Sequence, residues 1–171
     1  MRDEPGQEIV THRLLLTRIV DGDTADLVTM LVKPELHEYI GGVAPTPQDA
    51  TKRVQRWVRG SADPDILWIN YVARQSQGGR FVGLAQATVT RTPETGRRSC
   101  ELAYLVDPPA QHQGFGTEMM RGFHAELRDT LRPTEFTANI FSGHTASEGV
   151  AKAVGLIPTT ELVDGERVWR D

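Results

Sequence analysis

The stretch from Gln111 to Thr117 carries the clearest chemical signal in the sequence. It reads Gln-His-Gln-Gly-Phe-Gly-Thr, follows a β-like run that ends at Pro108-Pro109, and leads into a helical pattern. Glycines two positions apart let the backbone approach a ligand closely, and the first N–H groups of a helix have no partner within it. The helix dipole adds partial positive charge at the same end. Together these features predict a phosphate cradle built from main-chain N–H groups.

Two familiar nucleotide motifs do not fit this loop. A dinucleotide fingerprint needs a third glycine where this chain has Met119, and it needs a parallel strand-helix-strand unit. A P-loop needs Gly-Lys followed by Ser or Thr, whereas Gly116 is followed by Thr117 and Glu118. From the glycine spacing alone, a helix start that binds no ligand is an equal alternative.

The loop and its context resemble the GNAT superfamily of N-acetyltransferases. Gln111-x-x-Gly114-x-Gly116 matches the Gln/Arg-x-x-Gly-x-Gly/Ala motif that marks acetyl-CoA binding in that family. It follows a strand ending in Val106-Asp107-Pro108, as the family's motif usually does. The resemblance implies a mixed α+β fold: a central, mostly antiparallel mixed sheet with helices on both faces, and acetyl-CoA as cosubstrate.

Three further segments are similar to the RimJ/RimL-type branch of this family, whose named members acetylate protein N-termini. They are residues 11–16 (Thr-His-Arg-Leu-Leu-Leu), 39–42 (Tyr-Ile-Gly-Gly) and 146–156, the last with Ala146-Ser147 at its start and Val154-Gly155-Leu156 at its end. The resemblance covers about residues 10–170.

The resemblance also assigns residues to the coenzyme. The pyrophosphate would be bound through main-chain N–H groups of Gln111, His112, Gln113, Gly114, Phe115, Gly116 and Thr117. Leu105 and Val106 would pair by main chain with the pantetheine arm, and the thioester would lie where this strand splays from residues 136–140. Arg121 and Lys152 are candidates for phosphate contacts, with solvated surface cations as the alternative.

Transfer of an acetyl group to an amine makes three demands on the site. The amine must lose a proton, the oxyanion must find a donor, and the departing thiolate must be protonated or stabilised. Glu101 lies on the strand before the motif, where family members often carry a glutamate base. A solvent-facing strand carboxylate is its alternative role. An α-amino group, with a pKa of about 7.7–8.0, is partly neutral at pH 7, so a water relay could serve it as base.

The general acid is less clearly marked. Many relatives carry a tyrosine four residues before the glycine that closes the last helix, and this chain has Ala151 there. Ser147 matches a serine of RimJ/RimL-type relatives, with helix capping or a surface position as its alternative role. His144 stands where that branch usually has an asparagine that contacts pantetheine, and an imidazole can donate a hydrogen bond or a proton. Tyr104 is a further candidate acid, although a strand tyrosine more often packs in a core.

The acceptor side is expected among residues 24–60. Tyr39 and Trp57 are candidates to line the substrate pocket, together with Tyr104. The sequence of this region does not identify the acceptor. Cys100 has no recognisable histidine partner and is interpreted as a small buried strand residue. The histidines lack metal-ligand spacing, so no metal is expected.

Periodicity and turn signals predict the elements that position these residues. Thr46 and Pro47 mark a helix start, and Asp164-Gly165 marks a hairpin. The expected order is β-α-α-β-β-β-α-β-α-β-β, with three consecutive strands forming an antiparallel meander. In chain order the strands and helices are expected at 14–20, 24–33, 47–59, 66–73, 81–90, 100–106, 115–131, 136–140, 145–154, 156–163 and 166–170.

Length and composition fit one domain with a hydrophobic core: 171 residues, 39% hydrophobic, 25% charged and one cysteine. Residues 1–10 are expected to be a flexible tail and residues 11–171 a single acetyltransferase domain. No apolar run approaches the roughly 18–20 residues of a bilayer span, and the polar start lacks the apolar segment of a signal peptide. These features predict a cytoplasmic protein without membrane contact. A net charge of -4 without a basic cluster predicts no nucleic-acid partner.

The leading hypothesis is an acetyl-CoA-dependent N-acetyltransferase in which a bound amine attacks the thioester directly. The acceptor would be a protein N-terminus or a small-molecule amine, and the assembly a monomer or homodimer. A rival of another class is a non-catalytic GNAT-fold sensor or interaction module that holds acyl-CoA, which the missing tyrosine and His144 favour. A third is an unrelated α+β domain that binds no CoA.

Overall fold

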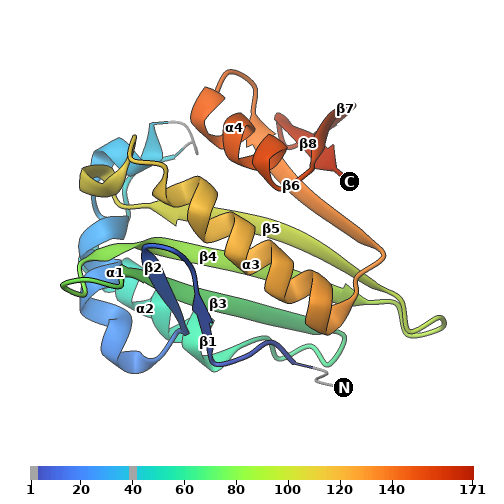
Figure 1. Cartoon of the computed structure of the whole chain (residues 1–171), viewed down its shortest axis with the longest axis horizontal. Coiled ribbons are helices and arrows are strands. Elements are labelled where there is room, and N and C mark those ends of the chain that lie inside the picture. Colours follow the sequence, from blue (N-terminus) through green and yellow to red (C-terminus); the bar gives the residue numbers. More distant parts are fainter. Residues whose placement is uncertain (1–3, 39–41) are drawn as a thin grey trace.

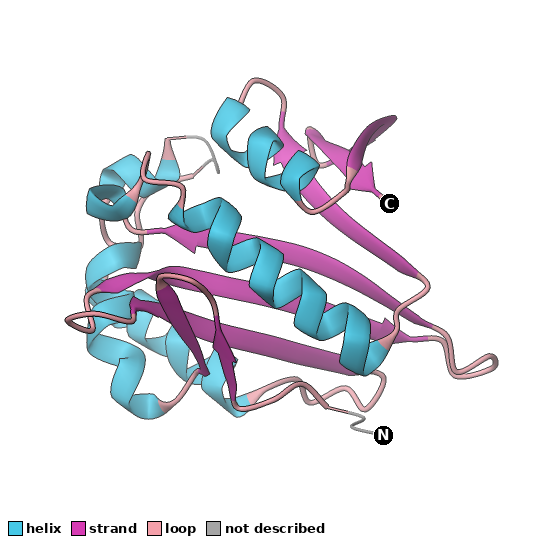
Figure 2. Cartoon of the chain, in the orientation of Figure 1, coloured by secondary structure: helices cyan, strands magenta, loops and turns pink. Residues whose placement is uncertain are grey.

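The computed structural model describes residues 4–38 and 42–171. Within these ranges eight strands form one sheet, and four α-helices pack against it (Figures 1 and 2). The elements are β1 (Glu8–Val10), β2 (Leu14–Arg18), α1 (Thr24–Leu31), α2 (Pro47–Arg59), β3 (Ile66–Gln75), β4 (Phe81–Arg91), β5 (Arg98–Val106), α3 (Phe115–Leu131), β6 (Glu135–Phe141), α4 (Thr145–Ala153), β7 (Ile157–Val163) and β8 (Glu166–Arg170).

The strand order across the sheet is β1-β2-β3-β4-β5-β6-β8-β7. Every neighbouring pair is antiparallel except β5 and β6, which run parallel because α3 crosses between them. The predicted meander is confirmed as β3-β4-β5. The predicted fold class, a mostly antiparallel mixed sheet with helices on both faces, is confirmed as well.

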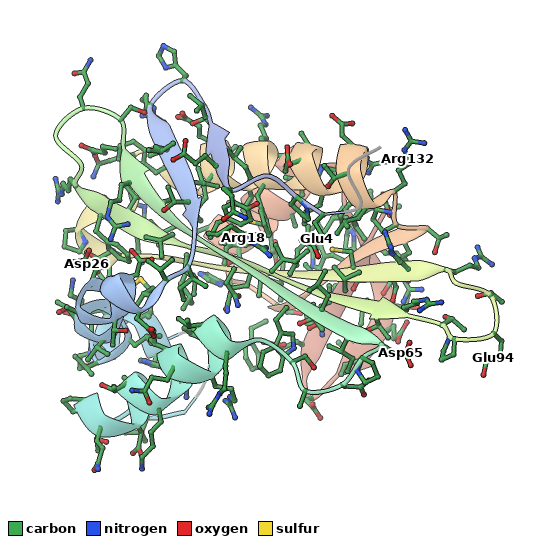
Figure 3. The ribbon with its side chains drawn as sticks, turned by 90° about the horizontal axis from the view of Figure 1, so that it is seen from below. Glu4, Arg18, Asp26, Asp65, Glu94 and Arg132 are labelled. Atoms are coloured by element: carbon green, nitrogen blue, oxygen red, sulfur yellow. The ribbon has the colours of Figure 1, made fainter. Side chains whose placement is uncertain are left out.

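The helices form a layer on each face of the sheet, as Figure 3 shows with the sheet seen from its edge. One apolar cluster joins α1 and α2 to the sheet around Leu27, Met30 and Leu84. The other joins α3 and α4 to the opposite face around Phe123 and Phe136. Because side chains alternate along a strand, neighbouring residues of β5 belong to different faces. This alternation decides which candidate residues can meet.

Local signals explain why the two long helices begin where they do. Thr46 accepts a hydrogen bond from the main-chain nitrogen of Asp49 at 3.2 Å, and Pro47 occupies the first turn of α2. Gly60, with a φ of 82°, ends that helix. Helix α3 begins after Gly114, whose φ of 77° is left-handed and favours glycine. The bounds of both helices agree with the sequence prediction.

Two sequence predictions differ from the structure at the N-terminal half. Residues 8–10 were expected in a flexible tail, but they form β1, which pairs with β2 and leaves Ile9 only 8% exposed. A single buried apolar residue in a three-residue strand is too weak a pattern to read from sequence. The helix expected at 24–33 ends at Leu31, where Lys33 N bonds to Met30 O just before a proline.

Candidate active site

Strands β5 and β6 pair only at one end. Their register joins residues 99–101 of β5 to residues 135–137 of β6 and stops at the pair Glu101 and Thr137. Beyond that pair the strands diverge, as Figure 1 shows, and the predicted splay is confirmed. In the described part of the chain no strand pairs with the β6-facing edge of β5 over residues 102–106. We call the diverging segments 102–106 and 138–141 the wedge.

The predicted phosphate loop, residues 111–117, follows the open end of β5. Gly114 adopts a left-handed conformation, and no side chain caps the first turn of α3. Gln111 donates a hydrogen bond from Nε2 to the main-chain oxygen of Val106 at 3.0 Å, which ties the loop to the end of β5. His112, Gln113 and Gly114 are exposed, whereas Phe115 is buried. The uncapped turn and the free strand edge therefore adjoin.

Gly116 lies where helix α3 packs closely against its neighbours. A Cβ atom at this position would lie 3.2 Å from Val106 Cγ2 and 3.7 Å from Val150 Cγ2. The absence of a side chain at Gly116 therefore lets α3 pack closely against β5 and α4. Gly83 on β4 acts similarly, because a Cβ there would collide with the carbonyl oxygen of Leu105. Both glycines fix the position of the last residues of β5.

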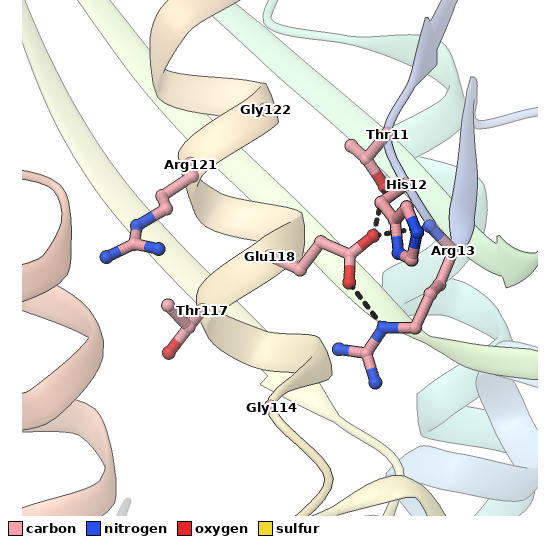
Figure 4. Close-up of a pocket in the computed structure, with 8 residues that line it drawn as sticks. All are labelled: Thr11, His12, Arg13, Gly114, Thr117, Glu118, Arg121 and Gly122. Atoms are coloured by element: carbon pink, nitrogen blue, oxygen red, sulfur yellow. Dashed lines mark hydrogen bonds and ion pairs between the residues drawn. The ribbon is translucent and has the colours of Figure 1, made fainter.

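Arg13 contacts the predicted phosphate loop from the side of α3 that carries Glu118 (Figure 4). Its Nη1 donates a hydrogen bond to the main-chain oxygen of Gln113 at 3.0 Å, and its guanidinium lies 4.4 Å from the ring centre of Phe115. Its Nε pairs with Glu118 Oε2 at 2.6 Å. In the sequence, Arg13 is marked only as part of the RimJ/RimL-like segment 11–16. Because Arg13 contacts residues about 100 positions away in the chain, no local sequence pattern predicts these contacts.

Glu118 anchors this arrangement with both carboxylate oxygens. Its Oε1 accepts hydrogen bonds from the Thr11 hydroxyl at 2.7 Å and from the main-chain nitrogen of Arg13 at 2.6 Å. Burial alone would raise the pKa of Glu118, but the bonds from Thr11 and Arg13 outweigh it and lower the pKa. The cavity drawn in Figure 4, of about 530 Å³, lies over these residues and the first turns of α3.

The two cations proposed for phosphate contacts are engaged elsewhere. Arg121 donates from Nε to the main-chain oxygen of Ala153 at 3.3 Å, which joins α3 to α4. Figure 4 shows Arg121 and Thr117 on the side of α3 away from Glu118. Lys152 Nζ lies 5.8 Å from the ring centre of Trp169.

Tyr104 spans the wedge. Its side chain packs with the α3-side cluster, and its hydroxyl donates a hydrogen bond to the main-chain oxygen of Ser147 on α4 at 2.9 Å. Burial raises the pKa of Tyr104 to about 12, although the bond to Ser147 lowers it in part. The phenol therefore keeps its proton at all ordinary pH values.

Ser147 and His144 lie together at the start of α4. Ser147 Oγ is 3.5 Å from His144 Nε2, the outer limit of a hydrogen bond. Burial lowers the pKa of His144, and Glu148 only partly opposes that effect. A lowered pKa favours the neutral imidazole, which can take part in hydrogen bonds as donor and acceptor. Among the described residues the Ser147 hydroxyl makes no hydrogen bond to the main chain of the first turn of α4, so the capping role proposed as its alternative is not observed.

A second cleft, of about 390 Å³, opens on the opposite face of the sheet. We call it the acceptor cleft. The register aligns Trp68, Thr88 and Glu101 in one row across β3, β4 and β5, with Asn70, Gln86 and Ala103 in the next. Helix α2 adds Arg56 and Trp57 as a wall. Glu101 is exposed in this cleft, and it is also the last β5 residue paired with β6.

The structure thus brings Glu101 and Trp57 together, as members of one cleft. Tyr104 does not join them, because its position in β5 directs it to the other face with Ser147 and His144. Leu105 faces the α1 side and Val106 the α3 side, and their main chains share the free edge. Tyr39 lies outside the described residues.

Other chemistry finds little support among the described residues. Cys100 is fully buried, and burial, with Glu101 and Asp171 adding to it, raises the pKa of its thiol to about 12. An unionised buried thiol is a poor nucleophile. In residues 4–38 and 42–171 no group of three His, Cys, Asp or Glu side chains could hold a metal ion. No helix in those ranges is long and apolar enough to cross a membrane.

The family model described as acetyltransferase (GNAT) domain matches residues 13–157. The chain belongs to the GNAT acetyltransferase family. Its class of activity is therefore that of an N-acetyltransferase, as the motif at residues 111–116 implied. Among curated proteins, no sequence matches the chain.

Several solved structures share the GNAT fold across nearly the whole chain. A GNAT-family acetyltransferase from Bacillus anthracis superposes with a TM-score of 0.76 at 14% identity, covering 96% of this chain and 97% of that one. RimL, the ribosomal L7/L12 α-N-protein acetyltransferase in complex with coenzyme A, superposes with a TM-score of 0.74 at 13% identity, covering 96% of this chain and 97% of that one. Spermidine N-acetyltransferase from Vibrio cholerae, in complex with CoA and spermine, superposes with a TM-score of 0.71 at 14% identity, covering 92% of this chain and 93% of that one.

Proposed function

We propose that this GNAT domain transfers the acetyl group of acetyl-CoA to a primary amine, with the coenzyme along the wedge and the amine in the acceptor cleft. The observation that carries the proposal is the junction of two main-chain surfaces. One is the free edge of β5 over residues 102–106, and the other is the uncapped first turn of α3. An extended pantetheine arm ending in a diphosphate is complementary to both surfaces.

The main chain of residues 111–117 would hold the diphosphate, and Leu105 and Val106 would pair with the pantetheine amides. The left-handed Gly114 and the uncapped helix N-terminus support this assignment, because both favour an anion. Arg13 contributes by holding Gln113 and Phe115 from behind, so that the N–H groups are already in position before the ligand arrives. An acidic chain can thereby bind an anion without a general positive field.

Glu101 is the proposed base. It is the last residue of β5 paired with β6, so the wedge has its vertex there, and its side chain lies in the acceptor cleft. Acetyl-CoA supplies an activated acyl carbon: a C–N bond forms to the amine nitrogen while the C–S bond breaks. Glu101 takes the proton that the amine loses, directly or through a water molecule.

Ser147 is the proposed donor to the departing sulfur. Its carbonyl oxygen is held across the wedge by Tyr104, and its hydroxyl lies 3.5 Å from the imidazole Nε2 of His144. In this account Tyr104 positions Ser147, His144 orients the hydroxyl, and the hydroxyl proton stabilises the thiolate until solvent protonates it. The tyrosine acid of other relatives is then not required.

The acceptor class follows from the family and not from the neighbours' own substrates. RimL acts on a protein N-terminus and the Vibrio cholerae enzyme on spermidine, and both acceptors are amines. We infer that the acceptor of this chain is a primary amine, and that the protein acts in the cytoplasm as one domain that includes β1.

The test measures free thiol released from acetyl-CoA by the purified protein with a panel of amines and N-terminal peptides, alongside the shift in melting temperature caused by coenzyme A. We expect amine-dependent thiol release and a rise in melting temperature. A rise without thiol release for any amine would instead support the acyl-CoA sensor. No rise at saturating coenzyme would contradict coenzyme binding altogether.

A further inference from the structure

The acceptor cleft has a chemically mixed lining that restricts the amines it can take. Its floor consists of two sheet rows, Trp68-Thr88-Glu101 and Asn70-Gln86-Ala103, and α2 supplies Arg56 and Trp57. The lining therefore combines two indole rings, one carboxylate, one guanidinium and two amides. The cleft thus offers apolar, ionic and hydrogen-bonding surfaces side by side.

The charges of the cleft balance. Glu101 is the one carboxylate and Arg56 the one cation among its described lining residues. Within the described part of the chain Arg56 forms no ion pair, and its side chain is exposed. Its guanidinium thus presents unpaired donors that match the geometry of a carboxylate. A polycation would meet a single carboxylate and a repelling arginine.

The polar floor is fixed in place. Gln86 donates from Nε2 to Asn70 Oδ1 at 2.8 Å, and Asn70, only 4% exposed, donates from Nδ2 to the main-chain oxygen of Trp57 at 3.4 Å. These bonds join the sheet to α2 at the residue next to Arg56. The guanidinium and Glu101 are therefore carried by elements whose relative position is set, with Trp57 and Trp68 as the apolar surfaces of the cleft.

Resting on the proposed function, we propose that the acceptor is an amino acid with an apolar side chain. Its amine lies at Glu101, its carboxylate pairs with Arg56, and its side chain packs against Trp57 and Trp68. Arg56 is then a specificity-determining residue that selects zwitterionic acceptors over simple amines, polyamines and peptide N-termini, which carry no carboxylate beside the amine.

The experiment measures kcat/KM at saturating acetyl-CoA for matched acceptors. Phenylalanine is compared with phenethylamine and leucine with isopentylamine, because each pair differs only by the carboxylate. Spermidine and an amidated phenylalanyl-diglycine peptide represent polyamines and peptide N-termini. The variants are Arg56→Gln and, as the matched control, Arg59→Gln, which changes an exposed arginine of the same helix outside the cleft lining.

We expect each amino acid to exceed its decarboxylated partner at least about tenfold, because a hydrogen-bonded charge pair is worth that much. Arg56→Gln should lower kcat/KM for the amino acids about 10–100-fold through KM and leave the simple amines within about twofold. Arg59→Gln should change neither group.

The inference is overturned if the wild type prefers spermidine, the peptide or the decarboxylated amines, or if Arg56→Gln lowers all acceptors equally. Failure of every compound in this set, with transfer to some other amine, overturns the inference and leaves the proposed function intact. Absence of transfer to any amine contradicts both.

Discussion

The Tyr104 hydroxyl lies 2.9 Å from the main-chain oxygen of Ser147 and joins β5 to α4 across the wedge. Among the described residues, no strand pairing joins β5 to β6 beside Tyr104, because the β5–β6 register ends at Glu101. This bond therefore sets the distance between the free strand edge and the helix that carries the proposed donor.

Tyr104→Phe tests that relationship. The change removes one hydrogen bond and keeps the ring, so the free energy of unfolding should fall by about 1 kcal/mol. If Tyr104 only positions Ser147, kcat should fall while KM for acetyl-CoA stays near the wild-type value, and Ser147→Ala should lower kcat at least as much. Steady-state kinetics and urea unfolding provide the measurements. A wild-type kcat in Tyr104→Phe would show that the bond has no part in turnover.

Glu101→Gln tests the proposed base. The amide keeps the shape of the side chain but accepts no proton, so kcat should fall by about 10²–10⁴-fold, and coenzyme affinity should hold. Calorimetric titration with coenzyme A supplies the affinity. Glu166→Gln is a matched control, because Glu101 contributes to the raised pKa of Glu166, after burial, and Glu166 does not line the acceptor cleft. Equal rates and pH profiles in wild type and Glu101→Gln would remove Glu101 from the mechanism.

Glu118→Gln tests the anchor behind the phosphate loop. The pKa of Glu118 is lowered on folding, so its ionised form contributes stability above the usual pKa near 4.5, and that contribution is lost as pH falls through the folded value. The wild type should lose stability in this acid range, and Glu118→Gln should show a flatter dependence from a lower starting value. Coenzyme affinity should also drop several-fold at pH 7.

Asp129→Asn provides the control for that experiment. Asp129 is an exposed carboxylate of the same helix, and no hydrogen bond or ion pair of its side chain is found among the described residues. Its replacement should leave the pH profile unchanged. If the free energy of unfolding changed with pH in the same way in wild type and Glu118→Gln, Glu118 would not stabilise the protein through its ionised form.

Gly83→Ala tests the close pairing of β4 with the end of β5. A Cβ would collide with the Leu105 carbonyl oxygen, so overpacking should cost about 1–3 kcal/mol of folding stability and displace the edge proposed to pair with pantetheine. The melting temperature in thermal unfolding and the coenzyme affinity measured by titration should therefore both fall. Gly149→Ala is the control, because a Cβ there meets nothing within 4 Å and a helical alanine stabilises. Unaltered coenzyme affinity in Gly83→Ala would contradict the role of the β5 edge.

Strong local signals account for what the sequence predicted correctly. The Thr46-Pro47 start and the glycine at position 114 fix the beginnings of α2 and α3, and the turns between residues 66 and 106 give the meander. The motif also placed its glycine-containing loop correctly between the end of β5 and the start of α3. In each case the deciding interactions lie within a few residues of chain.

What the sequence did not predict depends on contacts between distant segments. Arg13 reaches Gln113 and Glu118 only because β1 and β2 lie beside α3. Hydrophobic periodicity in the sequence does not predict that these elements are neighbours. The role of Gly83 depends on its register with Val106, and the exclusion of Tyr104 from the acceptor cleft depends on which face of β5 it occupies. A one-residue shift of register would reverse that last assignment.

A crystal structure of the protein with coenzyme A would test the central claim most directly. We expect the diphosphate on the main-chain nitrogens of residues 111–117, the pantetheine alongside residues 102–106, and the sulfur close to both Glu101 and Ser147. A diphosphate bound instead in the cavity beside Arg13, or a pantetheine arm lying outside the wedge, would contradict the account.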